Sequence, residues 1–332
     1  MGVPPESQVG GDPAARPGDA PPTVTVVIPT HDRRALLTQT LRTVLAQRGV
    51  AVHVVVVDDG SSDDTAAAVR GLADPRVVLV RNATARGVSA ARNQGIAAAT
   101  GDWVAFLDDD DLWAPAKLAS QVSAARRDGR AWACAGSVTV TSDLRIVGGG
   151  PPPSGEAIAA QLPFRNTVPA GASNVLVRAD ALASAGPFDT RLRHISDWDL
   201  WIRLGQHGAP AVVREPLVAY RLHDGNASAD TATLRAELEL IGGRYGEMRR
   251  GAPIDHAYAY RWAAWNLLRA GRRRDALAAY VSAVRAGDTR SLARAVVAVV
   301  HPGIARQTLR RHLQDPAWLS QAAAWLDELA PR

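Results

Sequence analysis

The first half of the chain alternates short, β-branched apolar runs with stretches of helical periodicity. The apolar runs lie at residues 24–28, 52–57, 77–80 and 103–107. Runs without polar interruptions suit strands that are buried on both faces of a parallel sheet. The helical periodicity predicts connecting helices at residues 35–47, 64–72 and 90–98. This alternation predicts a doubly wound α/β layer, in which ligands bind at the carboxyl ends of the strands.

The pattern is less regular between residues 108 and 230. A helix is predicted at residues 197–206, and strands are predicted at residues 131–140, 144–147, 173–178 and 217–222. Three glycines and three prolines follow one another in the segment from Gly148 to Gly155, a composition that predicts no regular element. We interpret this segment as either a linker or a mobile lid over a site.

The two ends of the chain differ from its centre. Residues 1–22 are rich in proline and glycine and lack the apolar core of a signal peptide, so we expect a disordered tail. The predicted α/β domain spans residues 23–230. Residues 231–332 carry no strand pattern, and within them residues 258–286 predict a helical hairpin broken at Gly271. We therefore expect a helical C-terminal appendage.

Composition excludes several classes of protein. Of the 332 residues, 47% are hydrophobic and 21% are charged, which are the proportions of a globular chain. The single cysteine, Cys134, excludes a disulfide scaffold and a cysteine-based zinc cage. No apolar run approaches the roughly 18 residues of a membrane-spanning helix. Since no export signal is recognisable either, we expect a cytoplasmic location.

The net charge is +5, and it comes almost entirely from arginine, because Lys117 is the only lysine. Because this preference for arginine over lysine runs through the whole chain, the net charge is weak evidence for nucleic-acid binding. We expect no nucleic-acid partner. Residues 244–274 are locally basic through Arg249, Arg250, Arg261, Arg269, Arg272, Arg273 and Arg274. They form either a solvated helix face or a surface attracted to anionic lipid, which would place the protein at the inner face of a membrane.

Carboxylates are concentrated where two of the predicted strands end. Asp58 and Asp59 follow the second strand, and Asp63 and Asp64 lie close behind them. Helix capping explains one or two of these residues, so we interpret Asp58 or Asp59 as a ligand-binding residue. The fourth strand ends in four adjacent aspartates, residues 108–111. Such a cluster repels itself unless it is neutralised, and Mg²⁺ or Mn²⁺ fits that need better than an acidic turn in water.

Two further groups of residues could take part in chemistry. Ser196 or Asp197 could cap the predicted helix at residues 197–206, which leaves a carboxylate of this segment available for chemistry. His223 follows the last predicted strand, and there it is either a structural residue or a metal ligand.

Taken in order, these blocks resemble the family-2 glycosyltransferases with the GT-A fold, a Rossmann-like mixed sheet that binds nucleotide sugars. The resemblance covers residues 23–226. It rests first on the opening strand and turn at residues 24–33 and on the blocks at residues 57–61 and 82–95. It rests further on two motifs: Asp108-Asp109-Asp110 resembles the DxD motif of the family, and Asp197 resembles the second residue of its Glu-Asp pair. Ser196 stands where that family has the glutamate.

The resemblance implies a role for each matching residue. Asp197 would be the catalytic base, and Asp110 with His223 would hold the metal. The donor would be bound by Pro29, Thr30, His31, Asp32, Asp59, Arg86, Asp108 and Asp109. Within this set, Asp59 would recognise the base edge, while Asp108 and Asp109 would meet the ribose and diphosphate. Arg86 and Arg92 are equally well explained by capping or by ion pairs.

The function implied is metal-dependent, inverting transfer of one sugar from a nucleotide-diphosphate sugar to a hydroxyl group. We expect a UDP-sugar donor, and a glycan, a lipid-linked saccharide or a small metabolite as acceptor. The Gln-x-x-Arg-Trp block of processive members is absent, which favours single transfer. The alternatives are a sugar-1-phosphate nucleotidyltransferase and a non-catalytic nucleotide-sugar-binding module. A glycoside hydrolase would need neither a metal nor a nucleotide pocket.

Overall fold

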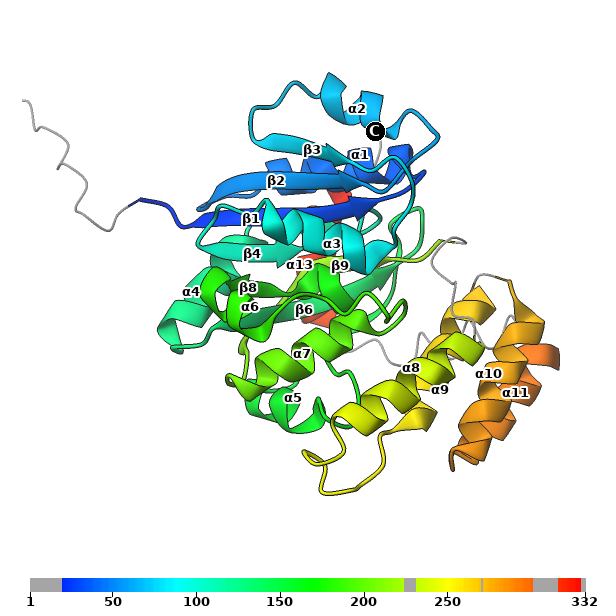
Figure 1. Ribbon diagram of the computed structural model, residues 1–332. Helices are drawn as coiled ribbons and strands as arrows, with labels where there is room; N and C mark the ends of the chain where they lie inside the picture. Colours follow the sequence, from blue (N-terminus) through cyan, green and yellow to red (C-terminus); the bar gives the residue numbers. More distant parts are fainter. Residues whose placement is uncertain (1–19, 224–230, 270, 301–315, 330–332) are drawn as a thin grey trace, which may run out of the picture.

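A nine-stranded mixed sheet forms the centre of the computed structural model, which describes residues 20–223, 231–269, 271–300 and 316–329 (Figure 1). The strands of this sheet are β1 (Thr23–Thr30), β2 (Ala51–Asp58), β3 (Val77–Arg81), β4 (Trp103–Phe106), β5 (Leu112–Trp113), β6 (Trp132–Val140), β7 (Ile146–Gly150), β8 (Leu176–Arg178) and β9 (Ala211–Arg221). Their order is β3-β2-β1-β4-β8-β6-β9-β5. Strand β7 pairs with the later part of β6, residues 137–140, beyond the residues that pair with β8.

The topology creates a crevice beside β1. Strands β3, β2, β1 and β4 are parallel, whereas β8 runs antiparallel to both β4 and β6. From β1 the chain moves outward to β2 and β3 and then returns to form β4 on the other side of β1. The carboxyl ends of β1 and β4 therefore meet at a switch point, where open α/β sheets bind their ligands.

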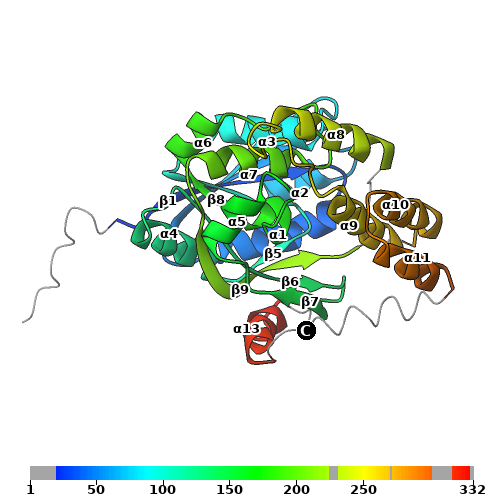
Figure 2. The same ribbon diagram turned by 90° about the horizontal axis from the view of Figure 1, so that it is seen from below.

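Helices cover both faces of the sheet. One face packs against α1 (Arg34–Leu45), α4 (Lys117–Arg127) and α13 (Pro316–Asp327). The other face packs against α3 (Val88–Ala97), α6 (Ala179–Ala185) and α7 (Ser196–Gln206), and α2 (Thr65–Gly71) lies beside β3 (Figure 2). The remaining helices are α5 (Gly155–Gln161), η1 (Gly171–Asn174), α8 (Thr231–Arg244), α9 (His256–Arg269), α10 (Arg273–Arg285) and α11 (Arg290–Val300).

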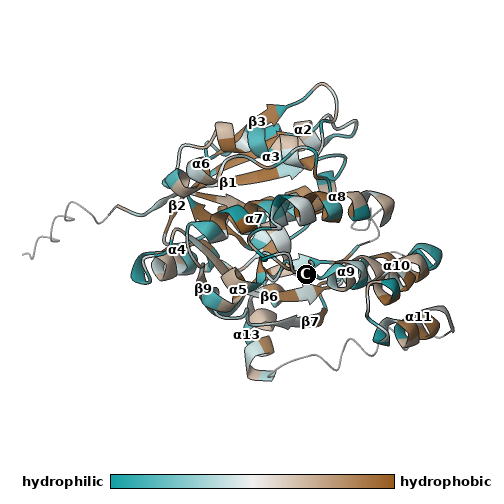
Figure 3. Cartoon of the chain, turned by 60° about the horizontal axis from the view of Figure 1, so that its bottom comes forward, coloured by the Kyte–Doolittle hydropathy of each residue, from teal (hydrophilic) through white to brown (hydrophobic). Residues whose placement is uncertain are grey.

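The predicted burial on both faces is confirmed for β1, β2 and β4 but is wrong for β3, which lies at the edge of the sheet and leaves Val78 54% exposed. Along β1, Val24, Val26 and Ile28 enter the core on the α1 side, while Val27 enters the core on the α7 side. Successive side chains of a strand point to opposite faces, so an uninterrupted apolar run supplies both cores at once. Figure 3 shows β1 and β2 largely in brown, whereas the helices around the sheet alternate between brown and teal.

Most of the predicted elements are confirmed, and two differ. The helical hairpin broken at Gly271 is α9 and α10, and the strand expected at residues 217–222 is the longer β9. The strand expected at residues 173–178 begins only at Leu176, because its first residues belong to η1. The glycine-rich segment was expected to be irregular, yet Gly148–Gly150 pair with β6. A side chain on Gly149 would lie 2.6 Å from the carbonyl oxygen of Ser137, so glycine is what permits this close pairing.

The elements described after residue 230 are all helices, as expected, but α13 lies far from the others and packs on β9. The indole of Trp318 donates to the carbonyl oxygen of Arg214 at 2.7 Å, and the indole of Trp325 donates to that of Pro216 at 2.9 Å. The pairing of β6 with β9 shifts register beside these residues, at Gly136. The indole groups of α13 therefore supply hydrogen bonds to carbonyl oxygens of β9 that the irregular β6–β9 pairing leaves without a strand partner.

The only lysine of the chain is completely buried. Lys117 lies at the start of α4, and its Nζ is 3.7 Å from the centre of the Trp113 ring. Within the described residues its Nζ has no hydrogen-bond partner. Burial lowers the pKa of Lys117 well below its usual value, against the smaller opposing effect of Cys134. Burial thus favours the neutral form of the amine, a form that an arginine cannot adopt because the guanidinium keeps its proton.

We predict opposite effects for two substitutions of this lysine. Lys117→Met should raise the free energy of unfolding by about 1–3 kcal/mol at pH 7, because it removes an unsatisfied polar group. Lys117→Arg should lower it by at least about 3 kcal/mol, because it buries a permanent charge.

The pH dependence provides the control for this prediction. Because burial lowers the pKa of Lys117 in the folded state, the free energy of unfolding of the wild type should rise with pH between that lowered pKa and the unfolded value of about 10.4. The difference in the free energy of unfolding between wild type and Lys117→Met should therefore be smaller at pH 9.5 than at pH 7. Urea denaturation at both pH values measures it, and a constant gap would show that the buried amine is charged.

Candidate functional site

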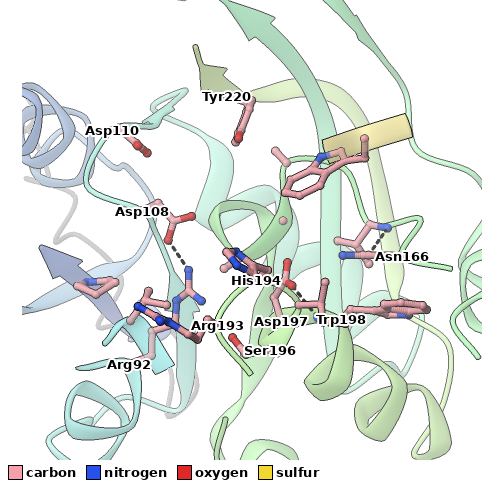
Figure 4. Close-up of a pocket in the computed structure, with 18 of the residues that line it drawn as sticks. Arg92, Asp108, Asp110, Asn166, Arg193, His194, Ser196, Asp197, Trp198 and Tyr220 are labelled. Carbon is pink, nitrogen blue, oxygen red and sulfur yellow. Dashed lines mark hydrogen bonds and ion pairs between the residues drawn. The ribbon is translucent and has the colours of Figure 1, made fainter. Parts of the chain in front are cut away.

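A cavity of about 730 Å³ opens at the carboxyl ends of β1 and β4. One wall contains residues 29–33, Asp59, the start of α3 and Asp108–Asp110. The opposite wall contains residues 165–172, residues 193–198 and parts of α8 and α9. Figure 4 shows Asp108 and Asp110 on one side of this cavity and Asp197 on the other. The cavity therefore lies at the switch point and brings together residues that are about ninety positions apart in the chain.

Arginine side chains neutralise the carboxylates that follow β4. The Arg92 guanidinium of α3 donates to Asp108 at 2.5 Å (Figure 4). Arg33, in the turn after β1, lies 3.0 Å from Asp109 Oδ1 and 2.8 Å from Asp110 Oδ2. The predicted need for positive charge at this cluster is thus met in part by the chain itself. The sequence alone assigns no role to Arg33, because a single arginine after the first strand carries no signal of its own.

Asp109 and Asp110 both line the cavity beside the turn after β1. The Thr30 hydroxyl donates to Asp109 at 2.7 Å, so two of the predicted donor-binding residues are in contact. Burial, and then the charge of Asp110, raise the pKa of Asp109 to about 6 against the opposing effect of Arg33. His223 Nε2 lies 2.8 Å from Asp110 Oδ2. The two residues that the resemblance assigns to a metal are therefore neighbours.

Asp111 differs from the other three aspartates because it points away from the cavity. Its carboxylate is fully buried and accepts the backbone N–H of Arg221 at 2.8 Å, while its carbonyl oxygen accepts the Thr40 hydroxyl. Burial, followed by the charges of Asp110 and Asp108, raises the pKa of Asp111 well above its usual value. Asp111 therefore ties β9 and α1 to the acidic loop and does not face a ligand.

Asp59 and Asp58 have different roles. Asp59 lines the cavity, and its carboxylate accepts the backbone N–H groups of Arg86 and Gly87 at 2.7–2.9 Å and the side-chain amide of Asn82 at 2.7 Å. Asp58 is fully buried beneath it, accepts the N–H of Ser61 and pairs with Arg81. Of the two aspartates, Asp59 is the one that lines the cavity, and its side chain also shapes the loop that follows β3.

Some of the other predicted donor-binding residues line the cavity, and others do not. Pro29 and His31 line the cavity, and His31 Nδ1 lies 2.9 Å from the carbonyl oxygen of Asp59. Asp32 is not part of the cavity lining. It has a positive φ of 53° and accepts the N–H of Ser62 at 2.6 Å, so it closes the turn against the loop after β2. Arg86 is exposed, and only its neighbours Ala85 and Gly87 line the cavity.

Asp197 lines the cavity from the first turn of α7. It is half-buried, and its carboxylate accepts the N–H of the next residue, Trp198, at 2.7 Å (Figure 4). It is not the residue at the N-terminal cap, which is Ile195. Burial raises the pKa of Asp197 to about 6, while Arg92 opposes the shift and Asp108 adds to it. A carboxylate with this pKa inside a cavity is suited to accept a proton near neutral pH.

The second carboxylate of this helix has no access to the cavity. Asp199 is fully buried and bonded to Arg203, Arg244 and the Tyr245 hydroxyl. Glu237 of α8 accepts backbone N–H groups from the segment before α7, at residues 193–195. Helix α8 therefore holds α7 and its approach in place, which leaves Asp197 as the carboxylate of this segment that a substrate can reach.

The chain offers two of the ligands that a divalent cation would need. Within the described residues, no three His, Cys, Asp or Glu side chains gather closely enough to hold a metal by themselves. Asp110 and His223 supply one oxygen and one nitrogen at 2.8 Å from each other. Mg²⁺ and Mn²⁺ are commonly bound by one or two protein ligands together with substrate phosphates, so these residues fit such an ion.

The arginines of residues 244–274 do not form one free basic surface. Arg249 is buried and donates to carbonyl oxygens, Arg261 pairs with Asp288, and Arg272 pairs with Asp275. None of the described helices is long and apolar enough to cross a membrane.

The comparisons agree with this geometry. Residues 25–183 match the model of the family described as Glycosyl transferase family 2. The chain is 39% identical over 166 residues to the succinoglycan biosynthesis protein ExoO of Rhizobium meliloti (strain 1021), an overlap that covers 49% of this chain and 45% of ExoO. It is 24% identical over 208 residues to the Escherichia coli UDP-Glc:alpha-D-GlcNAc-diphosphoundecaprenol beta-1,3-glucosyltransferase WfaP, covering 62% of this chain and 80% of WfaP.

A solved structure with a similar fold supports this comparison. The mannosyltransferase PcManGT from Pyrobaculum calidifontis, solved in complex with GDP-Man and Mn²⁺, superposes with a TM-score of 0.52 at 23% identity and covers 96% of this chain and 89% of that one. This likeness confirms the expected GT-A fold. The chain spans less than half the length of ExoO.

Proposed function

The chain belongs to glycosyl transferase family 2 through its residues 25–183, and we propose that it transfers one sugar from a nucleotide-diphosphate sugar to an acceptor hydroxyl with inversion. One observation carries the proposal: Asp197 and the Asp108–Asp110 carboxylates line opposite walls of one cavity. A binding module needs no carboxylate with a raised pKa across from its ligand, whereas a transferase needs a base there.

The donor is proposed to lie against the wall formed by β1, the loop after β2 and the acidic loop. Thr30, His31 and Asp59 lie at the carboxyl end of the sheet, where a nucleoside reaches them. The WfaP relative is named for UDP-Glc, and the PcManGT structure holds GDP-Man, which supports a nucleotide sugar as donor. We retain a UDP-sugar as our proposal for this chain.

Asp110 and His223 are proposed to hold a divalent cation, Mn²⁺ or Mg²⁺. Such an ion offsets the negative charge that develops on a departing diphosphate without any proton transfer. Arg33 already bridges Asp109 and Asp110, so the protein supplies positive charge to the same carboxylates. The proposed role of Arg33 is to keep the acidic loop compact when donor is absent.

Asp197 is proposed to remove the proton of the acceptor hydroxyl as its oxygen attacks the anomeric carbon. Because Asp197 faces the cavity from the wall opposite the diphosphate site, the attack comes from the side away from the leaving group, and the anomeric configuration inverts. Arg92 contacts Asp108, and its charge opposes the rise of the Asp197 pKa. The proposed arrangement thus keeps part of the base ionised at neutral pH.

The first prediction tests the donor and metal side. Incubation with a panel of UDP-, GDP- and dTDP-sugars should show nucleotide release that depends on Mn²⁺ or Mg²⁺. Asp110→Ala should abolish this release, and also the rise in melting temperature on adding UDP with metal, because one of two protein ligands is lost. The fold should survive, since repulsion with Asp109 is relieved.

Asp64→Ala is the matched control, because Asp64 belongs to the other acidic block but its side chain is 82% exposed and outside the cavity. Its nucleotide release should equal that of wild type. Full activity of Asp110→Ala with metal present would overturn the metal assignment.

The second prediction tests the base. Asp197→Asn should lower kcat by at least about 10²-fold and leave the donor KM nearly unchanged, because an amide cannot accept the proton. In wild type, kcat should rise with pH through about 6, where Asp197 loses its proton, and this step should be missing from the variant. Initial rates between pH 5 and pH 8 measure both effects.

Asp180→Asn is the matched control for this experiment. Asp180 also lies in the first turn of a helix, α6, and its carboxylate likewise accepts the N–H of the following residue, at 2.6 Å. Both variants should melt near the wild-type temperature. Equal kcat values for Asp197→Asn and Asp180→Asn would return Asp197 to a purely structural role.

We also propose that the C-terminal helices contact an anionic lipid surface, as the basic composition of the region suggested. Leu292 and Val296, one turn apart on α11, have exposures of 60% and 56%, and the exposed Arg290 and Arg294 lie on the same helix. Apolar side chains beside arginines suit the interface of an anionic bilayer. The lipid-linked acceptor in the name of WfaP is consistent with this contact.

Vesicle co-sedimentation tests the contact. Wild type should bind vesicles that contain phosphatidylglycerol but not pure phosphatidylcholine, and Leu292→Asp with Val296→Asp should abolish the binding. Met248→Asp, at another exposed apolar position outside α11, should leave it intact. Equal sedimentation of wild type and the double variant would refute this proposal.

A further inference from the structure

Helix α9 presents two different faces to its surroundings. One face is buried in the core through Tyr260, Ala263, Ala264 and Leu267. The other face lines the cavity through Tyr258, Trp262 and Trp265, which follow one another at the i, i+4 and i+7 positions of one helical stripe. Core packing explains the first face. It does not explain why aromatic rings occupy the second face, where they meet a cavity.

Trp262 is the most exposed of the aromatic residues that line the cavity. Its side chain is 42% exposed, although large apolar groups are ordinarily covered. An indole left open at the wall of a cavity provides a flat apolar surface for a ligand. It lines the same cavity as Asp197 and belongs to helix α9, whereas the predicted donor-binding residues belong to the sheet and the loops that follow its strands.

Polar groups surround this aromatic stripe. Asp255 accepts the N–H of Tyr258 at 2.8 Å and lies 3.6 Å from Arg165, whose guanidinium also stacks over the Tyr258 ring at 5.6 Å. Asn166 lines the cavity beside them. The wall therefore combines aromatic faces with carboxylate, guanidinium and amide groups, all of which can bond to hydroxyl groups.

This combination matches the chemistry of a pyranose ring. The axial C–H bonds of a hexopyranose give the ring an apolar face, while its hydroxyl groups point outward along the rim. An alkyl chain in the same place would bury Asp255, Arg165 and Asn166 without new partners, at a cost in free energy. The polar rim therefore favours a saccharide over a lipid chain at this wall.

We propose that α9 forms the acceptor subsite, and that the acceptor is a saccharide whose ring stacks on Trp262 and whose hydroxyl groups bond to Asn166 and Asp255. This inference rests on the proposed glycosyl transfer, and it adds the class of the acceptor. It also places the acceptor contacts outside residues 25–183, the part of the chain that matches the family. Trp262 would bind the acceptor, and Asp197 would remain the base.

The test uses methyl glycosides of glucose, galactose, mannose and N-acetylglucosamine, with octanol as an alkyl alcohol for comparison. Binding to the full chain is followed by saturation-transfer NMR, which needs no turnover. Nucleotide release from the preferred donor is measured with and without each alcohol. At least one methyl glycoside should bind wild type and accelerate release, and octanol should do neither.

Three variants sharpen the test. Trp262→Ala should raise the half-saturating concentration of that glycoside at least about fivefold, whereas Trp262→Phe should change it less because a ring remains. Leu277→Ala on α10, an exposed apolar residue outside the cavity lining, should have no effect. Release of nucleotide without acceptor should be the same in Leu277→Ala and wild type.

The outcomes separate the two proposals. An unchanged half-saturating concentration in Trp262→Ala would overturn the acceptor subsite, and so would binding of octanol without binding of any glycoside. Neither result would contradict the proposed use of a nucleotide-sugar donor. Wild type that releases no nucleotide from any sugar donor would contradict the proposed function, while the NMR titration would still report on the subsite.

Discussion

Charge compensation at the ends of β2 and β4 is the constraint on which the rest of the structure depends. Adjacent carboxylates would repel each other at the edge of an apolar sheet unless cations approached them. Arg92 of α3 meets Asp108, and Arg33 from the turn after β1 meets Asp109 and Asp110. The acidic loop therefore selects where the turn after β1 and helix α3 must lie, and those two elements form the donor wall.

The acceptor wall is assembled differently, by helices that come late in the chain. Glu237 of α8 binds three backbone amides ahead of α7, and Arg244 binds the buried Asp199. These contacts hold the start of α7, and with it Asp197, in place, but they do not involve the carboxylate of Asp197. Helix α9 then completes the wall with aromatic side chains. The proposed donor site is thus built by the sheet and its loops, whereas the proposed acceptor site depends on packing between α7 and the C-terminal helices.

A single side chain shows how burial restricts composition in this arginine-rich protein. Lys117 is surrounded by apolar groups and faces the Trp113 ring. An amine can lose its proton at such a place, and a guanidinium cannot. The one lysine therefore occupies a position where arginine would bury a permanent charge. Elsewhere, arginines such as Arg33 and Arg92 pair with carboxylates, for which their planar donors are well suited.

The sequence by itself determined the strands β1 to β4 and the acidic loop, because apolar runs and adjacent carboxylates are local patterns. The candidate base Asp197 followed from the resemblance to a known family. It could not determine that Asp111 and Asp199 turn inward while Asp110 and Asp197 face the cavity. The i, i+4, i+7 spacing on α9 is the same for a helix in a core and for one at a cavity wall. Only tertiary packing decides which side of a helix is covered, since that depends on partners distant in the chain.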